Sequence, residues 1–277
     1  MSTLTGKVAL ITGAGRHKGL GEAMAKRLAK DGAAVVITDI GVAKGPQFEK
    51  QHIGTSDEMN EIVAEIRKAG GKAAAVACDV LDEKSVEAAV AFTVKEFGRL
   101  DIMINNAGIG YLMTDILSLE QKDWDAVLNV NLRGCFFGTK HAAKQMIRQG
   151  GGGRIINTAS QAAKRGFAGA AAYVSSKHGL VGLTRTSALE FGKHAIRVNA
   201  ICPNHVTTGL GATQNEYRAK TMGITVDELL KRRSATIPLG RVGLTSDIAS
   251  TCAWLCSDEA AYVTGQNLDI SGGQEMH

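Results

Sequence analysis

Short apolar runs alternate with longer amphipathic stretches along nearly the whole chain of 277 residues. This alternation is typical of βαβ units, in which each short run forms a strand and each amphipathic stretch forms a crossover helix. The short runs are almost continuously apolar, as expected for parallel strands that helices cover on both faces. We therefore predict the α/β class, with a doubly wound parallel sheet of about seven strands and ligand sites outside their carboxyl ends.

The boundaries of the expected elements follow from these runs. Strands are predicted at Val8–Thr12, Ala34–Thr38, Ala73–Ala77, Ile102–Asn105, Arg154–Thr158, Arg197–Ile201 and Asn267–Ile270. Helices are predicted at Leu20–Lys30, Asp57–Lys68, Glu83–Phe97, Glu120–Arg148, Ala170–Phe191 and Ser246–Ser257.

No linker divides the chain. It has only three prolines, and the glycine run 150–153 is too short to separate domains, so we expect one domain over residues 1–277. Two connections, Gly41–Ser56 and Thr207–Ala235, exceed the ~12–15 residues of ordinary loops, and connections of that length are usually functional or mobile. We expect the second, with a short helix at Val226–Arg232, to form a lid over a substrate cleft.

Composition excludes several classes of protein. The net charge is +5, but the basic residues are scattered instead of forming a stripe, which argues against nucleic-acid binding. Five cysteines form no CxxC pair and no Cys/His cluster, which favours reduced thiols in the cytoplasm and predicts no metal site. We see no targeting segment and no apolar run near the ~20 residues that span a bilayer, so no membrane partner is expected.

The candidate catalytic groups are Tyr173 and Lys177, with Ser160 thirteen residues before the tyrosine. On a helix, positions i and i+4 share a face, so the phenol and the ammonium can point into one site. A phenol with a pKa of about 10 is a poor acid or base at neutral pH, and a nearby cation favours the phenolate. The same spacing also arises by chance on solvated helices, so the pair alone does not establish a site.

A glycine-rich loop, Gly13–Gly21, follows the first strand and opens a helix. Glycines allow the backbone to approach a pyrophosphate closely, and a helix N-terminus favours negative charge. Asp39 ends the second strand, where an acid would bind the adenosine ribose hydroxyls and repel a 2′-phosphate. Two alternatives stay open: Asp39 caps the following turn only, or Arg16 and Lys18 pair with a 2′-phosphate.

Four signatures together resemble the short-chain dehydrogenases/reductases across essentially the whole chain. They are Thr12-Gly13 with Gly19-x-Gly21, Asn105-Asn-Ala-Gly108, Ser160, and Tyr173-x-x-x-Lys177. The segments Cys78-Asp79-Val80, Asn129-Val-Asn131-Leu and Gly265-Gln, with Gly272-Gly273 near the end, fit the same pattern. The resemblance implies a Rossmann-type NAD(P)-binding fold and says little about the substrate.

The resemblance also implies roles for individual residues. Tyr173 would be the acid/base, Ser160 would bind the substrate oxygen, and Lys177 would lower the tyrosine pKa and hold the nicotinamide ribose. Asn131 would anchor a water between that lysine and solvent; alternatively, Asn131 bonds only backbone carbonyls of a bent helix and Ser160 only caps a turn. The implied cofactor contacts are Gly13, Gly19, Leu20, Gly21, Asp39, Asp79, Val80, Asn106, Ala107, Gly108, Tyr173, Lys177, Pro203, Val206 and Thr208.

Three departures from the family pattern concern the cofactor. The loop holds five residues between Gly13 and Gly19 where the family usually has three, and Pro203-Asn204 replaces the usual Pro-Gly. Gly41–Ser56 is longer than the usual connection, and it resembles insertions in relatives that release NAD(H) slowly. We expect it to close over the adenosine end.

These observations predict an NAD(H)-dependent oxidoreductase that interconverts a small secondary alcohol and a ketone, with NADP less favoured. Ser160, Gln161, Tyr173 and His205 are the expected substrate contacts, beside Tyr111, Phe167 and the lid, although His205 and Gln161 are equally well explained as ordinary loop residues. The alternatives are a 3-oxoacyl-carrier-protein reductase that uses NADPH and, from another class, an inactive dinucleotide-sensing protein. The family resemblance also implies a homotetramer.

Overall fold

The computed structural model describes residues 3–42, 53–110 and 114–276. Its strands are β1 (Val8–Thr12), β2 (Ala34–Asp39), β3 (Lys72–Ala77), β4 (Ile102–Asn105), β5 (Gly153–Thr158), β6 (Ile196–Pro203) and β7 (Asn267–Ile270). All pairings are parallel, and the strands form one seven-stranded sheet in the order β3-β2-β1-β4-β5-β6-β7. This is the doubly wound, Rossmann-type sheet that the sequence predicts.

Burial on both faces explains why the strands are so uniformly apolar. Every residue of β1 and of β4 is buried, so neither strand has a polar face. The register places Thr12 beside Thr38 and Asn105 beside Asn157. The carboxyl ends of neighbouring strands therefore meet at one edge, where the segments that follow β1, β2 and β4 come together.

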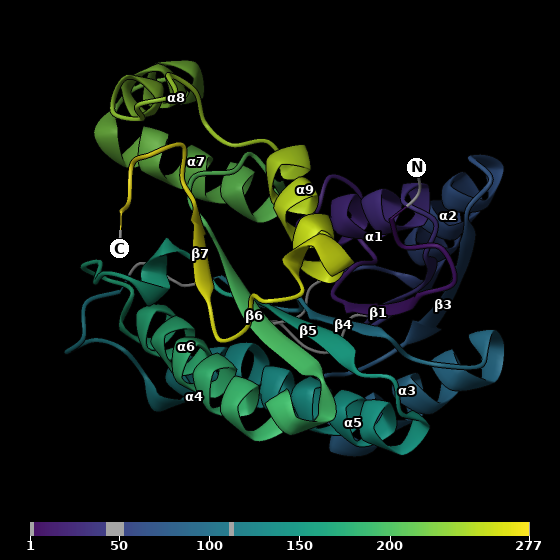
Figure 1. Cartoon of the computed structure of the whole chain (residues 1–277). Coiled ribbons are helices and arrows are strands. Elements are labelled where there is room, and N and C mark those ends of the chain that lie inside the picture. Colours follow the sequence, from purple (N-terminus) through teal and green to yellow (C-terminus); the bar gives the residue numbers. More distant parts are fainter. Residues whose placement is uncertain (1–2, 43–52, 111–113, 277) are drawn as a thin grey trace.

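Two layers of helices enclose the sheet (Figure 1). One layer holds α1 (Leu20–Lys30), α2 (Ser56–Lys68) and α9 (Thr245–Cys256), and the other holds α3 (Glu83–Phe97), α5 (Gly134–Gln149) and α6 (Ala171–Phe191). Each layer has its own apolar core: Met24, Leu28, Ile62, Ile66 and Ile248 pack on the first side, and Val86, Val90, Ala142, Met146 and Ala188 on the second.

The predicted helix Glu120–Arg148 is interrupted in the structure. It consists of α4 (Gln121–Leu128), a π-helical turn (Asn129–Arg133) and α5. A π turn adds one residue to a helical turn and often marks a functional site. Here it contains Asn131, one of the expected site residues.

The segment Thr207–Ala235 contains one helix more than the sequence predicts. Besides the expected helix, observed as α8 (Val226–Ala235), the segment contains α7 (Gly209–Met222), and the two helices stand apart from the main layers (Figure 1). Glycines in the first turn and a weak apolar pattern hide α7 in the sequence. It begins nonetheless because the Thr208 hydroxyl accepts a hydrogen bond from the Gly211 N–H at 3.2 Å.

Most of Gly41–Ser56 lies outside the described residues. At its two ends, Gly41 forms a parallel bridge with Thr55, and the Thr55 side chain caps α2. Among the residues that the structure describes, we find no helix that combines the length and the apolar character needed to cross a membrane.

Candidate active site

A cleft runs along the carboxyl edge of the sheet, where the strand order reverses between β1 and β4. Ligands of doubly wound sheets bind at such switch points. The expected site residues that line it are Gly13, Gly19, Leu20, Asp39, Asp79, Val80, Asn106, Ala107, Gly108, Ser160, Gln161, Phe167, Tyr173, Lys177, Pro203, His205, Val206 and Thr208. Gly21 and Asn131 lie behind this wall, and Tyr111 lies outside the described residues.

Tyr173 and Lys177 lie one turn apart on α6. The Lys177 Nζ lies 5.5 Å from the centroid of the Tyr173 ring and donates a hydrogen bond to the Thr158 carbonyl at 2.8 Å. Only 5% of Lys177 is exposed, and burial lowers its pKa to about 8. An amine with such a pKa gains and loses protons close to neutral pH, which suits a proton relay.

Asn131 holds the loop after β4 against this pair. Its Oδ1 accepts a hydrogen bond from the Ile109 N–H at 2.8 Å, and its Nδ2 donates to the Ile109 carbonyl and to the Ser176 Oγ, both at 3.2 Å. A Cβ on Gly108 would lie 3.2 Å from the Asn131 Oδ1 and 3.8 Å from the Lys177 Nζ. Asn131 therefore bonds a neighbouring loop, and not carbonyls of its own helix, while it lies close to the lysine.

Ser160 follows β5 in extended backbone, and its Oγ accepts a hydrogen bond from the Ala162 N–H at 3.1 Å. The turn-capping alternative is therefore present in the structure. A hydroxyl accepts and donates at the same time, so the cap leaves the Ser160 proton able to bond a substrate oxygen.

The glycine loop packs tightly against its neighbours because it lacks side chains. Gly13 has a φ of +63°, and a Cβ there would lie 2.6 Å from the Ala107 Cα. A Cβ on Gly21 would lie 2.6 Å from the Gly13 carbonyl oxygen, so Gly21 allows α1 to pack closely behind the loop. The N-cap of α1 is Gly19, which leaves the first N–H groups of the helix without a side-chain cap. These donors at the cleft wall fit a pyrophosphate.

Asp39 lies at the end of β2 and faces this loop. Its Oδ2 accepts a hydrogen bond from the Gly15 N–H at 3.1 Å, and its Oδ1 accepts one from the Ile40 N–H at 2.9 Å. Burial raises the pKa of Asp39, and the N–H groups of Ile40, Gly54 and Gly15 and the charge of Arg16 partly oppose that shift. A carboxylate has about four lone-pair positions, so these contacts leave capacity for ribose hydroxyls.

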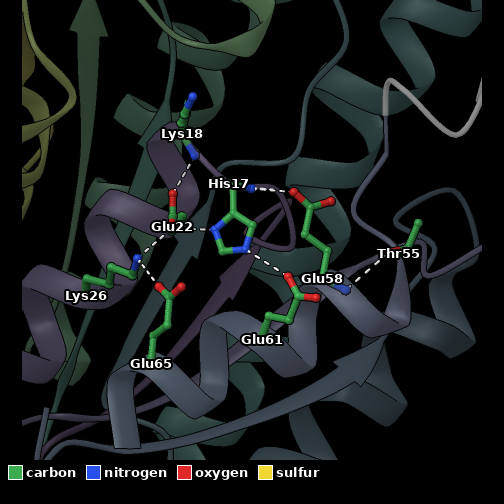
Figure 2. A network of polar contacts seen from close by, with 8 residues as sticks. All are labelled: His17, Lys18, Glu22, Lys26, Thr55, Glu58, Glu61 and Glu65. Atoms are coloured by element: carbon green, nitrogen blue, oxygen red, sulfur yellow. Dashed lines mark hydrogen bonds and ion pairs between the residues drawn. The ribbon is translucent and has the colours of Figure 1, made fainter. Parts of the chain in front are cut away.

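A polar network fixes the lengthened part of the loop, whose role the sequence leaves open (Figure 2). The His17 N–H donates to the Glu58 Oε1 at 2.6 Å, and the His17 ring nitrogens lie 3.0 Å from the Glu22 Oε1 and 3.3 Å from the Glu61 Oε2. The Lys18 N–H donates to the Glu22 Oε2 at 2.6 Å, although Lys18 has a positive φ of 60°. The loop is therefore attached to both α1 and α2.

Lys26 supplies the countercharge of this network. Its Nζ lies 2.6 Å from both the Glu22 Oε1 and the Glu65 Oε2. His17, Glu22 and Glu65 are close enough together to bind a metal ion. The ammonium already compensates both carboxylates, so the arrangement is explained without a metal.

We expect His17 to stabilise the fold more in acid than in alkali. Hydrogen bonds to Glu22 and then Glu61 raise the pKa of His17 above 6.5. A raised folded-state pKa adds stability that is complete below about pH 6.5 and disappears as the pH rises through the folded value. The difference in unfolding free energy between wild type and His17→Gln, from urea titrations, should be larger at about pH 5.5 than at about pH 8.5. An equal difference at both pH values would contradict this assignment.

The segment Thr207–Ala235 contributes residues that the sequence did not single out. Asn215 and Arg218 on α7 and Leu230 and Arg233 on α8 line the cleft. The sequence predicts that this segment covers the cleft, but it does not single out these four residues, and α7 was not predicted. Ile53, at the end of the long connection, lines the cleft as well.

Comparisons with known proteins agree with this geometry. The chain matches the family model described as enoyl-(acyl carrier protein) reductase over residues 13–275. It is 39% identical to a short-chain dehydrogenase/reductase of Armillaria gallica, over 98% of this chain and 97% of the relative. It resembles the structure of carveol dehydrogenase from Mycobacterium avium in complex with NAD, with a TM-score of 0.91 and 30% identity over 99% of both chains. It also resembles a variant of actinorhodin polyketide ketoreductase with NADPH, with a TM-score of 0.87 and 35% identity over 98% of both chains.

Proposed function

The chain belongs to the short-chain dehydrogenase/reductase family, and on that premise we propose that it is an NAD(H)-dependent enzyme that interconverts a secondary alcohol and a ketone. The observation that carries this proposal is the position of Lys177. Its buried ammonium lies between the Tyr173 ring and the Thr158 carbonyl, at the wall of a cleft that continues to Asp39.

In this proposal Tyr173 is the acid/base. When an alcohol is oxidised, the phenol oxygen takes the hydroxyl proton while the carbon loses hydride; when a ketone is reduced, the phenol returns the proton. The Ser160 hydroxyl bonds the substrate oxygen and holds it beside the tyrosine. The charge of Lys177 favours the phenolate, and a water held by Asn131 passes the proton to solvent.

The nicotinamide cofactor, when bound, accepts or supplies the hydride. The uncapped end of α1, with Gly13, Gly19, Leu20 and Gly21, would hold its pyrophosphate. Asp79 and Val80 would lie along the adenine, with Asn106, Ala107 and Gly108 beside the adenosine ribose. Pro203, Val206 and Thr208 would hold the nicotinamide end.

A reductase of carrier-protein substrates that uses NADPH is the second candidate. The likeness to the polyketide ketoreductase with NADPH supports it. Asp39 argues against it, because a carboxylate at the ribose 2′ position repels a phosphate.

Turnover decides between these functions and a protein that only senses a dinucleotide. We would incubate the protein with NAD and a panel of cyclic, aromatic and terpenoid secondary alcohols, which includes carveol, and follow NADH absorbance. Oxidation of at least one alcohol supports the proposal. Binding of NAD with no turnover in either direction would favour the sensing protein, and reduction of carrier-protein thioesters with NADPH would favour the second candidate.

We also propose a homotetramer in the cytoplasm, assembled through α6 and β7. The strand β7 is an edge of the sheet, and its residues are only partly buried. Leu189, near the end of α6, is 86% exposed. Multi-angle light scattering at micromolar concentration should give about four times the 29.1 kDa mass of the chain. A monomer mass would remove this proposal.

A further inference from the structure

The acidic side chains of the cleft lining lie at one end, where Arg16 lies as well. These acidic residues are Asp39 and Asp79, which follow β2 and β3 at one side of the sheet. Arg218 and Arg233 line the other end, in the segment that follows β6. Among the residues that the structure describes, no carboxylate lines the part of the cleft around Ser160 and Tyr173.

Arg218 differs from other arginines nearby. Arg232 on α8 pairs with Glu228, and Arg241 pairs with Asp247 at 2.7 Å. Arg218, by contrast, forms no ion pair with a carboxylate in the described parts of the chain, and it is only partly exposed. A guanidinium that faces a cleft without a countercharge is suited to bind an anion.

Arg233 is oriented by a neutral partner. Its Nη1 donates to the Oδ1 of Asn215, and Asn215 is 4% exposed. The bond therefore joins α8 to α7 and helps to fix the guanidinium at the cleft wall. Because the two arginines come from different helices, an anion between them would bind both.

The pKa of His205, which lies at the cleft wall, responds to the charges of nearby arginines. Burial first, and then the charges of Arg233, Arg218 and Arg165, lower its pKa to about 4. Arg165 pairs with Glu275 at 2.9 Å and is not among the residues that line the cleft, whereas Arg218 and Arg233 are. Near neutral pH His205 is therefore uncharged.

We propose that the substrate carries an anionic group, a carboxylate or a phosphate, which Arg218 and Arg233 bind while Ser160 and Tyr173 bind its alcohol or ketone oxygen. The substrate is then a secondary hydroxy acid or hydroxy phosphate, or the corresponding keto compound. This inference rests on the proposed alcohol/ketone oxidoreduction. The anionic group gives the substrate a second, fixed contact with the enzyme, and this contact orients the carbon that exchanges hydride.

The test compares charged and uncharged substrates. Secondary hydroxy acids with the hydroxyl on successive carbons would be assayed with NAD beside their methyl esters and beside matching hydroxy phosphates. Charge-assisted hydrogen bonds are about twice as strong as neutral ones, so the best acid or phosphate should exceed its uncharged analogue by about 10- to 100-fold in kcat/KM. The series with the higher kcat/KM, either the hydroxy acids or the hydroxy phosphates, identifies the anion.

Arg218→Gln should remove most of this advantage, with little change for the uncharged analogue or in KM for NAD. Arg232→Gln is the matched control, because that arginine lies outside the cleft lining and pairs with Glu228. Arg218→Lys keeps the charge without the planar fork and should give an intermediate value. Circular dichroism would establish that each variant is folded.

The outcomes separate the two proposals. If esters and acids are oxidised equally well, or if Arg218→Gln lowers kcat/KM for both by the same factor, the anionic substrate is excluded. The proposed oxidoreductase function is then unaffected. A rise in KM for NAD in Arg218→Gln would also exclude the anionic substrate, because the arginine would then bind the cofactor. Absence of NAD-linked turnover for every acid, phosphate and ester excludes the anionic substrate if a neutral alcohol of the first panel is oxidised, and it overturns the proposed function itself if none is.

Discussion

Replacement of Tyr173 by phenylalanine should lower kcat by about 10²- to 10⁴-fold, the usual contribution of general acid–base catalysis. The change removes only the phenol oxygen, so the ring remains near the Lys177 Nζ, which lies 5.5 Å from its centroid. Dinucleotide binding should remain, because the glycine loop and Asp39 lie on other elements. Steady-state kinetics with the best alcohol and a fluorescence titration with NADH measure the two effects.

The control for this experiment is Tyr262→Phe, since Tyr262 is fully exposed and does not line the cleft. That variant should retain wild-type kcat. A Tyr173→Phe enzyme that turns over like the wild type would remove the tyrosine from the mechanism. Loss of NADH binding together with activity would instead indicate a structural role for the hydroxyl.

The enzyme should prefer NAD over NADP by at least about 100-fold in kcat/KM, near 2.7 kcal/mol. A 2′-phosphate would lie beside Asp39, and like charges at ~4 Å repel by about 4 kcal/mol at an effective dielectric constant of 20. Arg16 lines the same end of the cleft, but an exposed ion pair is worth only ~0–1 kcal/mol.

Asp39→Ala should reduce this ratio mainly by improving the use of NADP. Asp39→Asn is the better-matched variant, since an amide oxygen can still accept the hydrogen bond from the Gly15 N–H. Initial rates with both dinucleotides at a fixed alcohol concentration give the ratio. Equal use of NAD and NADP by the wild type would mean that Arg16 reaches the phosphate, and Arg16→Gln would then restore the preference for NAD.

Local patterns in the sequence were enough to predict the sheet and the position of Tyr173 and Lys177 side by side at one cleft. Val8–Thr12 and Ile102–Asn105 are strands with the predicted bounds, because continuous burial leaves a continuous apolar run. Tyr173 and Lys177 face one site because helix geometry fixes the relation between positions four residues apart. These features depend on residues that are close together in the sequence, so the sequence alone is enough to predict them.

Features that depend on distant partners were not predictable. His17 is held by Glu58 and Glu61, which are 41 and 44 residues away in the chain. Arg218 and Arg233 both line the cleft only because α7 and α8 pack against each other. The sequence did not predict α7, because glycines occupy its first turn. The sequence indicated a lid at this place, but its charge at the cleft became visible only in the structure.

The uncapped first turn of α1 also connects the stability of the enzyme to its cofactor. A ligand that binds only the folded state stabilises it by about 2.7 kcal/mol at a hundred times its Kd, and the N–H groups after Gly19 would gain partners in that complex. Whole folded proteins are stable by only about 5–15 kcal/mol. A cell short of dinucleotide would therefore lose more of this protein to unfolding and proteolysis, so that its abundance would follow the dinucleotide pool as well as its own synthesis.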